Sequence, residues 1–198
     1  MLKTVCQVSS GLRKELGEKY YNLENIVYAV EAYSPIDEVY YVGYNVPAKN
    51  PIYGQFFKFV QTPNSYASAK TVVEIRYALH LDTQWRRFIV CKEMCHALDA
   101  DEGTHSATDR SIEAIVSGFS LMSARQEFLD NPLKAMTAEI LAEIGAVELL
   151  CPLEVRSRII TEANGQYEKY CDEFGIPRQI ASLAFNENII ASVRTMIT

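Results

Sequence analysis

The segment RFIVCKEMCHALDADEG, residues 87–103, places a lysine and a glutamate side by side among apolar residues. A helix formed from Phe88 to Leu98 would be apolar on almost every side, and such helices are normally buried. Burying Lys92 and Glu93 without partners would cost roughly several kcal/mol per charge. These two charges must therefore be paired with other groups or open onto a water-filled cleft. Either arrangement marks a polar site within the core.

The five residues from Lys92 to His96 read K-E-x-x-H. In the pattern H-E-x-x-H, two histidines four apart on a helix bind one metal ion, and the intervening glutamate acts as general base. Glu93 and His96 match the base and the second histidine, whereas Lys92 replaces the first histidine. Lys-Glu pairs are common in helices, so this partial match alone is a weak signal.

A second segment, EILAEIGAVELLCP at residues 139–152, resembles the ImmA/IrrE family of zinc metallopeptidase-like proteins. That family has the pattern E-x-x-A-N-x-F-A-A-E-L-L-M-P in the corresponding helix. Its earlier pattern R-F-x-x-A-H-E-L-G-H-x-L is similar to RRFIVCKEMCHAL, which contains Arg87, Phe88, Glu93, His96 and Leu98. The resemblance covers roughly residues 70 to 155.

The resemblance implies roles for four positions. Family members hold zinc with both motif histidines and the first glutamate of the later helix. The corresponding positions here are Lys92, His96 and Glu139, with Glu93 as the general base. The chain departs from the pattern at the first of these positions. It also departs at Cys95 for glycine, Glu143 for asparagine and Gly145 for phenylalanine, which indicates a remodelled site floor.

The lysine decides how the site is interpreted. A protonated ammonium has no lone pair for a metal and repels a divalent cation. It could instead replace the cation by pairing with Glu139 or Glu93. The plainer alternatives are a Lys92 that snorkels to solvent, a His96 satisfied within the core and a solvated Glu139. We expect no cofactor, or zinc if the metal site has been rebuilt.

The cysteines and the net charge indicate which other metal sites, compartments and partners to expect. Cys91 and Cys95 are four apart, but their direction on the helix lies about 100° from that of Lys92. We expect them to be small buried apolar groups. Five cysteines without a CxxC pair favour reduced thiols and a cytoplasmic protein. A net charge of −6 argues against direct nucleic-acid binding, and the sequence predicts no membrane span.

The pattern along the chain predicts a mostly helical α+β fold in a single metallopeptidase-like domain, residues 1–198. Helices are expected over residues 1–34, and a small antiparallel sheet of about three strands over residues 35–81. The degenerate zincin-like motif helix and its partner helices should occupy residues 82–155, with helices near 108–128 and 134–150. Further helices should fill residues 156–198. The sheet is expected to pack on the motif helix.

The segment TVVEIRYALHL, residues 71–81, has the alternation of a half-buried strand. It directly precedes the motif helix, so we expect it to border the cleft and to offer an edge for strand addition by a bound peptide. Glu74 and Arg76 are the predicted cleft-edge residues.

Three functions remain open on sequence grounds. The first is a non-catalytic ImmA/IrrE-type protein that binds a protein or peptide segment, or regulates a partner. The second is an active metal-dependent peptidase that uses Glu93 as general base with a rebuilt metal site. The third is an accessory protein of a prophage or other mobile element, because relatives of this kind often occur beside repressors.

Overall fold

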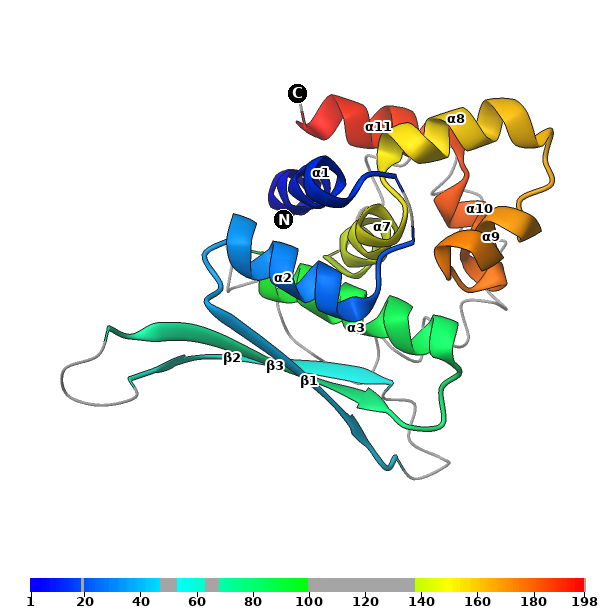
Figure 1. Ribbon diagram of the computed structural model, residues 1–198. Coiled ribbons are helices and arrows are strands. Elements are labelled where there is room, and N and C mark those ends of the chain that lie inside the picture. The colour runs from blue at the N-terminus through cyan, green and yellow to red at the C-terminus, as the bar shows by residue number, and fades with distance from the viewer. Residues whose placement is uncertain (19, 47–52, 63–67, 100–137, 198) are drawn as a thin grey trace.

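Three strands form one small sheet, and the described helices pack on one of its faces (Figure 1). The computed structural model describes residues 1–18, 20–46, 53–62, 68–99 and 138–197. The strands are β1 (Glu38–Tyr44), β2 (Gly54–Gln61) and β3 (Lys70–Ala78), arranged in the order β1-β3-β2. The predicted α+β class with a three-stranded sheet is confirmed.

The sheet is mixed, so the expectation of a purely antiparallel sheet is wrong for one of its two pairings. β2 pairs with β3 in the antiparallel sense, whereas β1 pairs with β3 in the parallel sense. β3 lies between the other two strands, so the chain passes from one edge of the sheet to the other before β3 forms.

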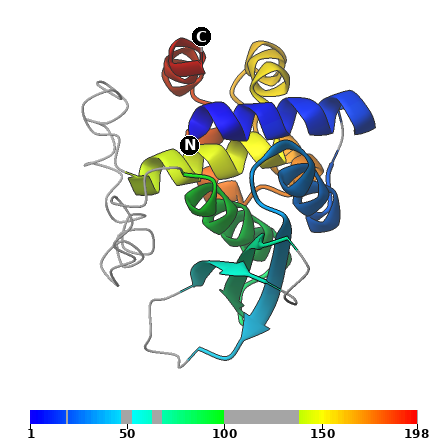
Figure 2. The same cartoon turned by 90° about the vertical axis from the view of Figure 1, so that its left-hand side faces the viewer.

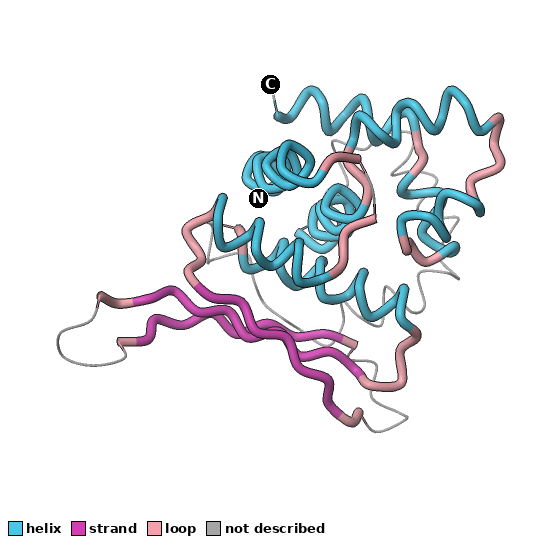
Figure 3. Tube along the Cα trace, in the orientation of Figure 1, coloured by secondary structure: helices cyan, strands magenta, loops and turns pink. Residues whose placement is uncertain are grey.

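The pairing register assigns each side chain to one face of the sheet. Val39, Val73 and Ile75 are buried in the hydrophobic core, with Tyr41 and Phe56 packed against it, and the helices cover this face. The residues that alternate with these along each strand, such as Tyr40, Glu74 and Phe57, form the outer face. In Figure 3, the β2–β3 pair extends beyond the helices at one end.

The motif helix lies directly on the sheet. It is α3 (Thr83–Ala97), and it packs against both β2 and β3. Asp82 caps this helix, because its side chain accepts a hydrogen bond from the Trp85 backbone N–H at 2.8 Å. This cap satisfies one of the backbone donors that the first helical turn leaves unpaired.

The remaining helices stack above α3 (Figure 2). α7 (Ala138–Leu150) packs against α3 and against α1 (Leu2–Leu16), and α2 (Leu23–Tyr33) contacts α1 and β1. The chain then continues through α8 (Leu153–Ala163), α9 (Glu168–Phe174), the short turn η1 (Arg178–Ile180), α10 (Ala181–Ala184) and α11 (Glu187–Ile197). The helix predicted near 108–128 lies outside the described residues.

Candidate functional site

The charged pair of the motif helix is buried. Every residue from Arg87 to Ala97 is buried, and the Lys92 side chain is only 2% exposed. α3 lies between the sheet and α7, so no side of its central turns faces bulk water. Lys92 and Glu93 must therefore find partners within the protein.

The Lys92 ammonium connects two carboxylates from two helices. Its Nζ lies 2.9 Å from Oε2 of Glu139 on α7 and 3.2 Å from Oε1 of Glu93 on α3. His96 Nε2 lies 3.2 Å from the other oxygen, Oε1, of Glu139. The predicted convergence of Lys92, His96 and Glu139 is confirmed, and a Lys92 that snorkels into bulk solvent is excluded.

The electrostatics favour the charged forms of both partners. Burial alone would lower the pKa of Lys92, but the carboxylates of Glu93 and Glu139 raise it above its ordinary value. Burial alone would raise the pKa of Glu139, but contact with His96 and the charge of Lys92 lower it to about 2. At neutral pH the site therefore holds an ammonium against an ionised carboxylate.

His96 is fixed from a second direction by the sheet. Its ring stacks on Phe56 of β2, with centroids 6.0 Å apart and an interplanar angle of 7°. Together with Glu139, this contact fixes the plane of the imidazole. Sequence reasoning did not single out Phe56, because the strand pattern around it does not reveal which strand lies over the motif helix.

Cys95 and Gly145 fit closely against each other where α3 meets α7. A Cβ atom added to Gly145 would lie 2.7 Å from the Cys95 Sγ. The sulfur therefore occupies space that is open only because residue 145 has no side chain. Glu143, also on α7, is buried.

The two thiols near the site are buried and protonated. Cys91 and Cys95 are fully buried, as predicted, and neither forms a disulfide. Burial raises the pKa of Cys91 to about 12 and raises that of Cys95 well above its ordinary range. Both thiols stay protonated at neutral pH, whereas a cysteine nucleophile reacts as the thiolate.

The side chains do not fit a zinc ion. A catalytic zinc needs three protein ligands with available lone pairs, and here an ammonium stands at the first ligand position. That ammonium already lies within 3.2 Å of both carboxylates. Within the described ranges, no group of three or more His, Cys, Asp or Glu side chains is arranged to hold a metal ion.

β2, rather than β3, borders the site at the edge of the sheet. A Cβ atom on Gly54 would lie 3.0 Å from Glu93 Oε1, Phe56 stacks on His96, and Lys58 Nζ donates to the Ala97 carbonyl oxygen at 3.2 Å. β2 thus follows α3 past the buried charges.

The predicted role of β3 in strand addition is wrong. β3 is paired along both edges, by β1 and by β2, so a peptide cannot add to it. Glu74 and Arg76 lie on its outer face, where Arg76 Nε donates to Glu74 Oε1 at 2.7 Å. They are not cleft-edge residues.

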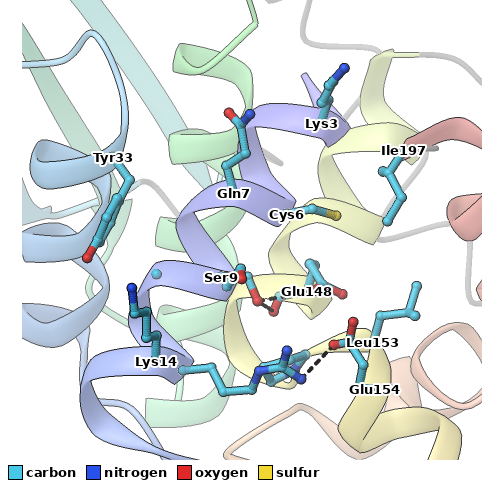
Figure 4. A pocket seen from close by; sticks show the side chains of 14 residues that line it. Lys3, Cys6, Gln7, Ser9, Lys14, Tyr33, Glu148, Leu153, Glu154 and Ile197 are labelled. Atoms are coloured by element: carbon cyan, nitrogen blue, oxygen red, sulfur yellow. Dashed lines mark hydrogen bonds and ion pairs between the residues drawn. The ribbon is translucent and has the colours of Figure 1, made fainter.

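A second buried ion pair lies on the far side of α7. Arg156 Nη2 donates to Glu148 Oε2 at 2.6 Å, and Ser9 Oγ donates to Glu148 Oε1 at 3.0 Å. Burial raises the pKa of Glu148 despite the opposing charge of Arg156. Figure 4 shows Ser9 and Glu148 at the wall of a pocket of about 520 Å³ beside α1. These bonds join α1, α7 and α8, and Arg156 was not predicted.

Comparison of the chain with models of known protein families, with curated proteins and with solved structures finds no match. Among the described residues, no helix has both the length and the apolar character required to cross a bilayer.

Proposed function

We propose that this protein is a non-catalytic, peptide-binding relative of metallopeptidases, in which the Lys92 ammonium takes the place of the metal ion. The observation that carries the proposal is the position of Lys92 Nζ, 2.9 Å from Glu139 and 3.2 Å from Glu93. The ammonium supplies the counter-charge that a cation would otherwise provide to these carboxylates. The ImmA/IrrE resemblance of the two helices supports the same interpretation.

The same contacts explain why hydrolysis is not expected. A metallopeptidase needs a metal-bound water, a nearby general base and groups that stabilise the oxyanion. Lys92, with its pKa raised, is a cation without a lone pair, so it cannot act as a ligand or a base. The Glu93 carboxylate, the family's base, already contacts this ammonium at 3.2 Å.

The binding surface in this proposal is the outer edge of β2. Ala78 N–H donates to the Tyr53 carbonyl oxygen at 2.9 Å, so these opposed residues form a hydrogen-bonded pair. Hydrogen-bonded and non-hydrogen-bonded pairs alternate along an antiparallel ladder. The backbone groups of Gly54, Phe56 and Lys58 therefore point away from β3, at the edge beside the buried charges. An extended peptide would pair with these groups by strand addition.

Two substitutions at one position test this proposal. Lys58→Ala and Lys58→Pro both remove the side-chain bond to Ala97, but only proline also removes the N–H at the outer edge of β2. The probe is a peptide enriched on the native chain from a random display library. We expect Lys58→Pro to weaken its binding at least tenfold relative to Lys58→Ala. Equal affinities for the two variants would contradict binding at this edge.

Incubation of the same peptide with the native chain tests the catalytic alternative. The proposal predicts that mass spectrometry recovers the peptide intact, with and without added zinc. Cleavage by the native chain that disappears in Glu93→Gln would instead support an active peptidase with a rebuilt site.

A further inference from the structure

The outer face of the sheet carries large apolar side chains that none of the described helices covers. The register brings Tyr40 and Val42 of β1 to the same face as Phe57 and Phe59 of β2. Their exposed fractions are 56%, 49%, 42% and 43%, respectively. Several large apolar side chains exposed on one face often mark an interaction site.

The charges on this face are balanced. Lys70 pairs with Glu38, and Arg76 pairs with Glu74, so the face has two acidic and two basic residues in a chain whose net charge is −6. A nucleic acid or an anionic membrane would require a basic excess, and a basic partner would require an acidic one. The face has neither excess.

We propose that this face binds the same face of a second copy of the chain, forming a two-fold symmetric dimer. Glu74 and Arg76 lie two residues apart on the central strand, about 7 Å along it. The two-fold axis of this dimer lies midway between the two sheets, runs perpendicular to the strands and passes over β3 at Ile75. It places Glu74 of each copy opposite Arg76 of the other. The arrangement is self-complementary, as an isologous interface requires.

The same axis also pairs the apolar side chains of β1. Rotation about it keeps β1 of one copy over β1 of the other, and it brings Tyr40 against Val42 of the second copy. Phe57, on β2, flanks Glu74 on the side away from β1 and lies opposite Gln55 of the second copy. Two sheet faces packed in this way lie about 10 Å apart, a gap that aromatic side chains fill. The dimer does not use the outer edge of β2, so it does not depend on the proposed peptide binding.

Charge reversal on the central strand tests the dimer. Sedimentation velocity of the full chain should give a mass of twice 22.4 kDa for the native protein at micromolar concentration. Glu74→Arg gives each copy two positive side chains at residues 74 and 76 of β3, and Arg76→Glu gives each copy two negative ones. Each variant alone should repel its own copy and sediment as a monomer. An equimolar mixture of the two variants should restore the dimer, because opposite charges then meet across the axis.

The mixture also excludes misfolding as the cause of dissociation, since unfolded variants would not reassociate. Glu187→Arg, an exposed reversal on α11, is the matched control and should remain dimeric. A native protein that is monomeric, variants that each remain dimeric, or a mixture that stays monomeric would each overturn the proposal.

Discussion

The Lys92 Nζ and the Glu139 Oε2 lie 2.9 Å apart, and their contact joins the motif helix α3 to α7. The two residues are far apart in sequence. In the proposed function, this ion pair makes the connection between the helices that a shared metal would make.

Removing the ammonium should strongly destabilise the fold. Lys92→Met keeps an apolar stem of similar length but leaves Glu93 and Glu139 without their counter-charge. Loss of one partner from a buried ion pair costs about 3 to 5 kcal/mol in free energy of unfolding. Urea denaturation measures this loss, and the same substitution in a Glu139→Gln background should cost less. A loss below about 1 kcal/mol would match a surface lysine instead.

The ion pair should also give a specific dependence on pH. The pKa of Glu139 is lowered from 4.5 to about 2, so its contribution to stability is present above the ordinary pKa. This contribution is lost as pH falls through the folded-state value, because the unfolded chain binds the proton first. The difference in unfolding free energy between the native chain and Glu139→Gln should shrink as pH falls from about 5 to about 2. A constant difference over this range would contradict the ion pair.

The close approach of α3 and α7 predicts a steric coupling between Cys95 and Gly145. Gly145→Ala places a Cβ atom 2.7 Å from the buried sulfur, and overpacking of this kind costs about 1 to 3 kcal/mol. Cys95→Ala removes the sulfur, so the same alanine at residue 145 should then cost much less. A double-mutant cycle measured by thermal or urea unfolding checks this prediction. Additive effects would show that the two positions do not compete for space.

Local sequence patterns predicted the elements better than their arrangement. The apolar run around Lys92 and the capping residue Asp82 specify a buried helix, and the alternation of residues 71–81 specifies a strand. Such signals depend on neighbouring residues. The parallel pairing of β1 with β3 depends on contacts between distant segments, which periodicity does not encode. For the same reason, the strand beside the site was assigned to β3 rather than β2.

The site was only partly predictable. The need to pair a buried lysine followed from the sequence alone, and the resemblance of residues 139–152 supplied Glu139 as its partner. The stacking of Phe56 on His96 had no sequence signal, because it depends on the position of β2 at the edge of the sheet. The fit of Cys95 against Gly145 likewise became visible only when the two helices were placed together.

The zinc content of the native chain and of Lys92→His tests the central claim most directly. Both proteins would be purified without chelators or a metal-affinity tag and compared by elemental analysis. We predict far less than one zinc per native chain. A neutral imidazole at position 92 would complete a three-ligand set with His96 and Glu139, so Lys92→His should bind close to one zinc. Near-unit zinc in the native chain would contradict the account, and absence of zinc from the histidine variant would show that more than one ligand separates this site from a metal centre.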